Sequence, residues 1–372
     1  MLPKQKITYI ISGVNRSLAF EWIGKELDRS KFDLEFILLF NGKPRIEKIL
    51  RQNGSEVHTI NYKSKRSIPR ALLVMLYLLL KNKPDIVHTH LFEATLLGSV
   101  LAKLIGVKKR LQTRHHATSN LIYHPKMVKW DKFNTSLATK IIAPSKNVAK
   151  TLVEKEDVDL NKVEVVYHGF KIDEIENVPV EKVEQLRSKY KIHSNEGPIV
   201  GVISRYLELK GIQFIIPAFK RLFKDHPNAK LILANAVGPF KNEIRRLLKE
   251  IPEDRILEIE FENEIFALYK LFDLFVHVPV NETVEAFGQI YIEALASGIP
   301  SIFTLSGVAA EFVRPGHDAV VVDFMNSEEI YLGMKKILSD QVFREQIIEN
   351  GRKGLSKFEF HHFIKELERL YE

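Results

Sequence analysis

Short apolar runs alternate with longer amphipathic runs along almost the whole chain, and this alternation restricts the fold more than any other feature of the sequence. It is typical of βαβ units and parallel sheets. The predicted strands fall at residues 7–11, 33–39, 57–60, 85–88, 109–113, 140–143, 163–166, 198–203, 230–234, 256–259, 274–278, 301–303 and 319–322. The predicted helices fall at residues 19–28, 69–81, 94–104, 146–154, 211–223, 241–249, 265–271, 286–296 and 328–338.

The pattern breaks near Asn177 and Pro179 and then begins again, which indicates two domains. A chain of 372 residues also exceeds one ordinary core, because domains hold roughly 100 to 200 residues. We expect a Rossmann-like domain at residues 1–175, a second one at residues 176–345, and a final helix at residues 346–372 that packs across the junction. Doubly wound α/β domains bind ligands beyond the carboxyl ends of their strands, so we expect the two to face each other across a cleft.

Composition and targeting features predict a soluble, cytoplasmic protein. Hydrophobic residues make up 45% of the chain and charged residues 27%, which allows both halves to bury a core. Ser12 and Gly13 interrupt the first apolar stretch, unlike the longer stretch of a secretory signal. The longest apolar run, residues 71–80, is shorter than the roughly 20 residues of a spanning helix. Because there is no cysteine, disulfides and thiolate metal sites are excluded.

Positive charge is concentrated in the first half. Residues 1–175 contain 30 Lys and Arg against 17 Asp and Glu, whereas the remaining residues contain 25 against 30. This excess suggests an anionic partner, such as a membrane surface, a phosphate-bearing acceptor or nucleic acid, although a solvated basic surface accounts for it equally. The basic residues 62–70 precede the apolar run 71–80, an arrangement that can seat a protein on an anionic bilayer. The same run is also typical of a buried helix.

The most specific pattern is EAFGQIYIEALASGIP at residues 285–300, after a predicted strand. Glu285 and Glu293 are eight residues apart, which on one helix separates them by about two turns and roughly 80°. Both carboxylates can therefore line one groove. The N–H groups at the start of this predicted helix favour a phosphate. They belong to Phe287, Gly288, Gln289 and Ile290.

This block resembles the E-x7-E motif of glycosyltransferase family 4, whose members have the GT-B fold of two facing Rossmann-like domains. The resemblance implies that Glu285 holds hydroxyls of a donor sugar, that Glu293 binds ribose hydroxyls, and that the amides between them hold a diphosphate. Residues 304–311, TLSGVAAE, resemble the family's glycine-containing loop, with Gly307 as the candidate for a further amide at the phosphate.

Residues 203–211, ISRYLELKG, resemble the family's G-R-L-x-x-x-K-G turn, with Ser204 in place of the usual glycine. The resemblance implies that Arg205 and Lys210 clamp the donor's phosphates. Cleavage of a glycosyl–phosphate bond builds negative charge on the leaving group, and two preplaced cations stabilise that charge. They would take the place of a metal ion, so we expect neither a metal nor another cofactor.

Residues 12–16, SGVNR, resemble the family's first glycine loop, with Ser12 in place of a glycine. Gly13 and Arg16 are therefore donor-binding candidates. A glycine allows the backbone to approach a phosphate closely, and the helix that follows presents its positive end. A plain strand-to-helix turn explains the same residues. The nicotinamide fingerprint G-x-G-x-x-G is absent from this loop.

Two histidine pairs follow predicted strands, His88 with His90 and His115 with His116. The resemblance implies that the first pair lies on the acceptor side and that His115 or His116 positions the donor sugar. The sequence does not distinguish between these two. A structural role and a zinc site are the alternatives, but no accompanying carboxylate pattern supports zinc.

The sequence thus predicts a retaining glycosyltransferase that moves a sugar from a nucleotide diphosphate sugar to an acceptor hydroxyl, in surface-glycan or lipid-linked glycan synthesis. No clear nucleophile is present, and the resemblance implies a front-face mechanism in which the leaving phosphate helps to deprotonate the acceptor. The alternatives are a non-hydrolysing nucleotide-sugar epimerase of the same fold and a non-catalytic binder of an anionic polymer. The expected partners are the donor, a glycan or lipid-linked acceptor and the inner face of an anionic membrane, without nucleic acid.

Overall fold

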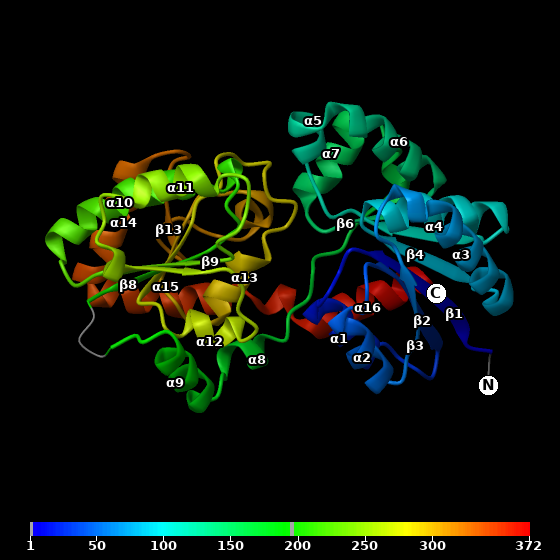
Figure 1. The fold of residues 1–372 in the computed structure, drawn as a ribbon, viewed down its shortest axis with the longest axis horizontal. Helices are drawn as coiled ribbons and strands as arrows, with labels where there is room; N and C mark the ends of the chain where they lie inside the picture. Colours follow the sequence, from blue (N-terminus) through cyan, green and yellow to red (C-terminus); the bar gives the residue numbers. More distant parts are fainter. Residues whose placement is uncertain (1–2, 194–196) are drawn as a thin grey trace. The chain divides into compact units, whose positions relative to one another are not determined.

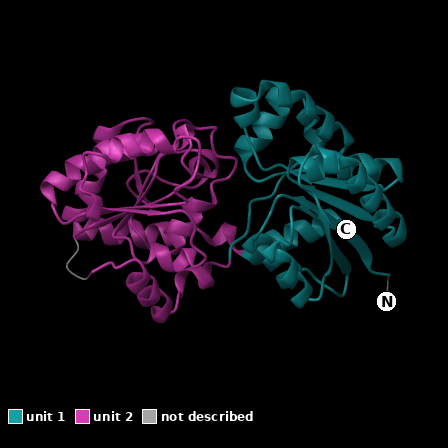
Figure 2. Cartoon of the chain, in the orientation of Figure 1, with its two compact units in different colours: residues 1–170, 360–372 teal, residues 171–359 magenta. Residues whose placement is uncertain are grey.

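The computed structural model describes residues 3–193 and 197–372. They form two compact units, coloured separately in Figure 2. Unit 1 comprises Met1–Phe170 and Phe360–Glu372, and unit 2 comprises Lys171–Glu359. Unit 1 thus ends its first segment at Phe170, whereas the sequence places the boundary at residue 175. The C-terminal segment differs from the expectation because it is divided, with residues 346–359 in unit 2 and the remainder in unit 1.

Each unit is built on a parallel sheet, and the strands of both sheets lie where the sequence predicts them. The strands of unit 1 are β1 (Gln5–Ser12), β2 (Phe32–Phe40), β3 (Glu56–Asn61), β4 (Ile86–His90), β5 (Lys109–Thr113), β6 (Lys140–Ala143) and β7 (Val163–Val165). The strands of unit 2 are β8 (Ile199–Ile203), β9 (Lys230–Ala234), β10 (Ile256–Ile259), β11 (Leu274–His277), β12 (Ser301–Phe303) and β13 (Val320–Val321).

The order of the strands in each sheet indicates where each unit binds ligands. The sheet of unit 1 has the order β3-β2-β1-β4-β5-β6-β7, and that of unit 2 has the order β10-β9-β8-β11-β12-β13. Both follow the Rossmann sequence 3-2-1-4-5-6, in which ligands bind beyond the carboxyl ends of the strands where the order reverses. This switch point lies between β1 and β4 in unit 1, and between β8 and β11 in unit 2.

Helices lie on both faces of each sheet, as Figure 1 shows. The helices of unit 1 are α1 (Leu18–Glu26), α2 (Arg45–Gln52), α3 (Ile68–Asn82), α4 (Phe92–Leu104), α5 (Ser119–Tyr123), α6 (Val128–Leu137), α7 (Lys146–Glu156) and α16 (Phe360–Tyr371). The helices of unit 2 are α8 (Ile172–Glu176), α9 (Val180–Lys189), α10 (Ile212–Asp225), α11 (Lys241–Leu248), α12 (Ile265–Tyr269), α13 (Gln289–Ala296), α14 (Ser327–Ser339) and α15 (Gln341–Lys353). The sequence prediction does not contain α2, α5, α6, α8 or α9.

The last helix, α16, belongs to unit 1 because it buries an apolar stripe there. Its buried residues Phe360, Phe363, Ile364, Leu367 and Tyr371 recur at helical spacing. The Tyr371 hydroxyl hydrogen-bonds to that of Tyr9 in β1, and Lys109 Nζ donates to the Tyr371 carbonyl at 2.6 Å. Tyr371 therefore provides hydrogen-bond partners for side chains of β1 and β5.

The apolar run at residues 71–80 is buried on one side and exposed on another. In α3, Ala71, Met75, Leu78 and Leu79 are buried in the core of unit 1. Leu73, Tyr77 and Leu80 are exposed by 69%, 64% and 53%. Among the described residues, no helix has the length and hydropathy that crossing a membrane requires.

Candidate active site

The loop between β8 and α10 is fixed by a glycine that cannot be replaced without a clash. Gly211 has φ +76°, and a Cβ atom there would lie 1.8 Å from the carbonyl oxygen of Val278, just after β11. The Val280 N–H donates to the Leu209 carbonyl at 3.0 Å. The loop between β8 and α10 is thus held against the segment that follows β11. It brings Lys210 to that segment.

Lys210, Glu285 and His277 form a compact polar cluster. Lys210 Nζ lies 2.5 Å from Glu285 Oε1, and His277 Nε2 lies 3.1 Å from the same oxygen. Burial raises the pKa of Glu285, but the Lys210 charge and the His277 hydrogen bond outweigh it and hold this pKa at about 2. Glu285 is therefore a carboxylate at any physiological pH. Sequence reasoning missed His277, although it occupies the carboxyl end of β11.

The predicted helix geometry around Glu285 is wrong. The helix α13 begins at Gln289, after Gly288 at φ +87°, so Glu285 lies in the preceding loop rather than on the helix. The Ser306 hydroxyl accepts a hydrogen bond from the Glu285 N–H at 3.1 Å and helps to hold this loop. Within the described parts of the chain, the N–H groups of Gln289 and Ile290 have no hydrogen-bond partner. These amides form the positive end of α13.

Gly307 has a different role from the expected one. Its N–H donates to the Glu282 carbonyl at 3.0 Å, so this amide is already engaged. A Cβ atom at position 307 would lie 2.7 Å from the Glu285 Cβ and 2.8 Å from the Phe287 carbonyl oxygen. Gly307 therefore lets its loop pack against the loop that carries Glu285.

Glu293 lies deeper, on α13, beside Tyr269. The Tyr269 hydroxyl donates to Glu293 Oε2 at 3.1 Å. Burial raises the pKa of Glu293 to about 7, and this hydrogen bond offsets only part of the effect. The surroundings of the two glutamates thus shift their pKa values in opposite directions: the pKa of Glu285 is lowered and that of Glu293 is raised. Tyr269, from α12, is a second site residue that the sequence did not indicate.

In unit 1, the loop after β1 is a tight turn with its amide occupied. Gly13 has φ +70°, and its N–H donates to the Leu39 carbonyl at 2.9 Å. Arg16 lies 3.4 Å from Glu21 and keeps a partly exposed side chain. Both residues follow β1, which borders the switch point between β1 and β4. The Gly13 N–H is not available to a phosphate in this conformation.

His88 does not fit the expected acceptor-side role. It has no exposed surface, its Nδ1 lies 2.8 Å from the Tyr371 hydroxyl, and its Nε2 lies 2.8 Å from Thr113 Oγ1. Burial lowers the pKa of His88 to about 3, so the ring is neutral. His88 therefore supports α16. His90 is also buried, stacked on Tyr9, and its Nδ1 lies 3.1 Å from His115 Nε2.

His115 and His116 both line a cavity of about 510 Å³ in unit 1, beyond the carboxyl ends of β4 and β5. The His116 Nε2 atom lies 3.2 Å from Asp131 Oδ2, whereas His115 contacts His90. Burial lowers the pKa of His115 to about 3. Leu91, at φ +69°, joins β4 to α4 at the same edge. A positive φ is energetically unfavourable for a leucine, and strained backbone conformations of this kind cluster at functional sites.

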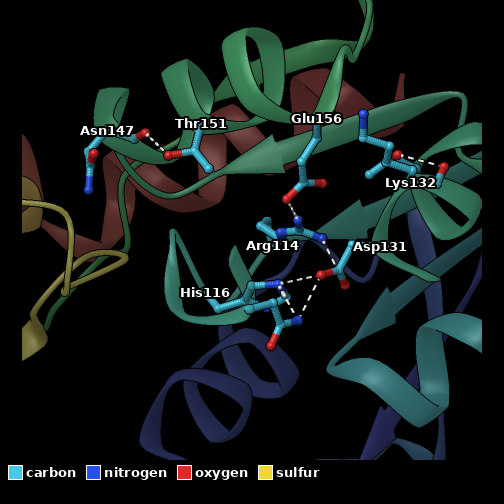
Figure 3. Close-up of polar contacts among 9 residues, drawn as sticks. Arg114, His116, Asp131, Lys132, Asn147, Thr151 and Glu156 are labelled. Atoms are coloured by element: carbon cyan, nitrogen blue, oxygen red, sulfur yellow. Dashed lines mark hydrogen bonds and ion pairs between the residues drawn. The ribbon is translucent and has the colours of Figure 1, made fainter. Parts of the chain in front are cut away.

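Arg114, in the wall of this cavity, contacts two carboxylates. Arg114 lies between Asp131 and Glu156, with His116 beyond Asp131, as Figure 3 shows. His116, Asp131 and Glu156 offer ligand atoms close enough to hold a metal ion. The Arg114 guanidinium already contacts both carboxylates and offsets part of their charge. The donor set therefore fits a buried ion-pair network better than a metal site.

Strand order and the polar loops at both switch points define the chain as an α/β protein of the GT-B class. Residues 184–354 match the family model for glycosyl transferases group 1, and residues 21–174 match the model for glycosyltransferase family 4. Together the two models cover most of both units. The chain therefore belongs to the group 1, family 4 glycosyltransferases, and the predicted transferase class is confirmed.

Individual relatives agree with this assignment. The capsular polysaccharide biosynthesis glycosyltransferase CapM of Staphylococcus aureus is 27% identical, with 100% of this chain and 97% of that protein covered. N-acetyl-alpha-D-glucosaminyl L-malate synthase of Bacillus anthracis is 24% identical, with 94% and 91% covered. The structure of Anabaena Alr3699/HepE in complex with UDP-glucose superposes with a TM-score of 0.82 at 18% identity, covering 98% and 99%, and shows a shared fold.

Proposed function

We propose that unit 2 binds a nucleoside diphosphate sugar, with the diphosphate held by Lys210, Arg205 and the first amides of α13. The observation that carries this proposal is the position of Lys210 Nζ, 2.5 Å from Glu285 in the loop that leads into α13. An ammonium group and a helix N-terminus at one switch point form an anion site. Arg205 is exposed and has no side-chain partner among the described residues, so it can turn toward an incoming phosphate.

Each charged group has a distinct role in the proposed transfer. Negative charge develops on the leaving diphosphate, and Lys210 and Arg205 stabilise it without a metal ion. Glu285, which stays ionised, accepts hydrogen bonds from hydroxyls of the donor sugar. Glu293 accepts hydrogen bonds from the ribose hydroxyls, and His277 and Tyr269 are positioning residues for the two carboxylates.

We propose that the sugar is transferred with retention of its anomeric configuration. Among the described side chains of the cluster, none combines a free nucleophilic atom with an adjacent base, since Lys210 and His277 both contact Glu285. This favours a front-face reaction, in which the bond to the diphosphate breaks as the acceptor hydroxyl attacks from the same side. The acceptor proton then passes to the departing phosphate.

A ligand screen followed by product analysis tests the function. UDP, GDP, ADP and their common sugar conjugates are compared by thermal shift, since a ligand at 100 times its Kd adds about 2.7 kcal/mol of stability. The matching donor is then incubated with and without simple glycosides as acceptors, and product anomers are assigned by NMR. A transferase releases nucleoside diphosphate in an acceptor-dependent manner. Conversion of the donor sugar without an acceptor would instead indicate an epimerase.

We also propose that α3 and α4 seat the enzyme on an anionic membrane. The exposed Leu73, Tyr77 and Leu80 of α3 lie on a helix that packs against α4, where Leu104 is 73% exposed. Exposed basic residues flank them, namely Arg70, Lys81 and Lys103. Apolar side chains bordered by Lys and Arg suit a bilayer with acidic headgroups.

Co-sedimentation with vesicles tests this surface. Vesicles that contain phosphatidylglycerol are expected to bind the wild type, and pure phosphatidylcholine vesicles to bind it much more weakly. Leu73→Glu should reduce binding, whereas Leu332→Glu, at an exposed leucine of α14 in unit 2, should not. Equal binding by wild type and Leu73→Glu would contradict the proposal.

A further inference from the structure

A smaller cavity of unit 1, of about 80 Å³, lies at the opposite ends of the strands from the ligand-binding loops. The residues that line it belong to the amino-terminal halves of β1 and β2, to the start of β3 and to the end of α3. Three carboxylates line it, those of Asp33, Glu35 and Glu56, whereas Lys6 is the one cation among the described lining residues. Because ligands of this fold bind beyond the carboxyl ends of the strands, this cavity lies outside the proposed transfer site.

Two of these carboxylates lie side by side on neighbouring strands. Thr8 of β1 is in register with Glu35 of β2, and Glu35 is in register with Glu56 of β3. Residues in register share a face of the sheet, and His58, two residues after Glu56 in β3, lies on the same face. Adjacent carboxylates repel each other unless a proton or a cation lies between them.

Glu35 is the buried member of this group, and its charge has no lysine or arginine partner. The Glu35 side chain accepts hydrogen bonds from the Thr8 hydroxyl and the Asn82 amide, and the residue is 9% exposed. Among the ion pairs of the described residues, none joins Glu35 or Glu56 to a lysine or an arginine. Lys6 Nζ donates instead to the Asn82 carbonyl at 3.3 Å. Buried charges in proteins are paired or coordinate metals, so this arrangement indicates a missing cation.

The ring of His58 supplies a nitrogen that also lacks a partner. His58 Nε2 lies 3.0 Å from Glu56 Oε1. The two atoms do not form a hydrogen bond, and the buried Nε2 atom has no other hydrogen-bond partner in the part of the chain that the structure describes. Two ligands of one zinc ion, each about 2.0–2.2 Å from the metal, lie about 3.0–3.5 Å apart. The separation of Nε2 and Oε1 therefore fits two ligands of one ion.

The three side chains together form a donor set for a transition metal. One ligand atom each from Glu35, Glu56 and His58 lie within 4.8 Å of one another, and no arginine pairs with these carboxylates as Arg114 does in the larger cavity. Imidazole with carboxylates suits zinc, whereas Mg²⁺ and Ca²⁺ prefer oxygen ligands alone. The cavity has room for a water molecule as the fourth ligand, since one water needs about 10–15 Å³.

We propose that Glu35, Glu56 and His58 bind one Zn²⁺ ion. The ion would join β2 to β3, which is the edge strand of the sheet of unit 1, and would offset the charge of the two glutamates. Its role is structural. The inference is independent of the proposed transferase function, and the stabilisation of the leaving diphosphate without a metal ion is unaffected.

Calorimetric titration of the EDTA-treated, full-length chain tests the site, with ZnCl₂, MgCl₂ and CaCl₂ compared. The wild type should bind one Zn²⁺ at micromolar concentration or below and should not bind Mg²⁺ or Ca²⁺ in that range. His58→Gln and Glu56→Gln should each weaken Zn²⁺ binding by more than about 100-fold, because loss of an outer-shell partner alone costs about 10–100-fold. His58 and Glu56 are 27% and 57% exposed, which favours folding of both variants.

Two control variants exclude other zinc sites. His361 and His362, on α16, are exposed and adjacent, with ring centroids 3.9 Å apart. The double variant His361→Gln/His362→Gln should bind Zn²⁺ as the wild type does. Equal affinity of the wild type and His58→Gln would overturn the inference. Loss of binding in His116→Gln instead would also overturn it, because the ion would then lie in the larger cavity.

Diffraction at the zinc absorption edge tests the site without any substitution. Crystals of the wild type with one equivalent of Zn²⁺ should show an anomalous peak about 2.0–2.2 Å from His58 Nε2 and from one oxygen each of Glu35 and Glu56. A peak elsewhere, or none, would contradict the proposal. In solution, Zn²⁺ should raise the urea midpoint of the wild type and leave that of His58→Gln unchanged, since an ion that binds only the folded state stabilises it.

Discussion

Replacing Lys210 with methionine is the sharpest test of the donor site. The substitution keeps the length of the side chain and removes the ammonium group that lies 2.5 Å from Glu285 Oε1. Both side chains are largely buried, 20% and 12% exposed, so solvent screens the charge only weakly. Loss of one preorganised group that stabilises developing charge lowers kcat by about 10²–10³, or about 2.7–4 kcal/mol. We expect a loss of this size for Lys210→Met.

A change in pH dependence should accompany this loss. In the wild type the pKa of Glu285 is held at about 2, so this carboxylate does not titrate in the assay range. Without the Lys210 charge, burial is opposed mainly by His277, and the pKa of Glu285 rises. The variant should therefore gain an acidic limb, with kcat increasing with pH as Glu285 ionises. A group that only stabilises the fold would not produce this limb.

Lys241→Met is the matched control for this experiment. Lys241 Nζ lies 2.9 Å from Glu260 Oε1 in the same unit, but Glu260 is 69% exposed. Exposed pairs contribute about 0–1 kcal/mol to stability, and this pair lies outside the proposed site, so kcat should be unchanged. The assay is acceptor-dependent release of nucleoside diphosphate, with folding checked by circular dichroism. A kcat for folded Lys210→Met within about threefold of the wild type would refute the reasoning, given the loss expected for such a group.

Four further substitutions test the structural reasoning by urea unfolding. Burial raises the pKa of Glu293 from 4.5 to about 7, so the folded state binds this proton more tightly and wild-type stability falls as pH rises through that window. Glu293→Gln should therefore gain roughly 3 kcal/mol relative to the wild type between pH 4.5 and pH 8, and a constant difference would contradict the assignment. Gly211→Ala should lose at least about 2 kcal/mol, because its Cβ would meet a carbonyl oxygen at 1.8 Å, whereas Gly13→Ala, with open space around its Cβ, should lose about 1 kcal/mol. Tyr371→Phe leaves two buried polar atoms without their partner and should cost about 1–3 kcal/mol, and a neutral result would show that α16 docks by apolar contacts alone.

The sheets could be predicted closely because their central strands, such as β4, β8 and β9, are buried along their whole length. The bounds of β5, β6, β9, β10 and β12 agree with the prediction, since each is a short run with turn or charged residues at its borders. Their order also follows from the sequence once two Rossmann-like halves are assumed. Lys210 and Glu285 could also be assigned to one site, because they follow β8 and β11, the two strands that border the switch point of unit 2.

One of the helices that the sequence missed, α6, has mostly polar residues on its buried side. The helix α6 buries Asp131, Asn134 and Thr135, so its inward face has no apolar stripe for a periodicity argument to find. Asp131 and Asn134 line the cavity of unit 1, which is why the apolar pattern is broken there. Likewise, α13 begins late because Gly288 adopts a left-handed conformation. Local propensity did not reveal that conformation.

The polar partners of the site also depend on tertiary structure. Tyr269 and Glu293 are 24 residues apart and meet only when α12 packs beside α13. His88 lies near the carboxyl end of a strand, where ligand-binding residues are expected, yet its two ring nitrogens bond to Tyr371 and Thr113, which are distant in the sequence. A motif at a strand end thus locates a site, but the three-dimensional packing decides which of its side chains remain available to a ligand.

A crystal structure of the chain with a bound nucleoside diphosphate tests the central claim most directly, with UDP, GDP and ADP soaked in turn. The account predicts that the diphosphate oxygens lie within hydrogen-bonding distance, about 3 Å, of Lys210 Nζ and of the first N–H groups of α13. A diphosphate bound elsewhere, with Lys210 still paired only to Glu285, would contradict it.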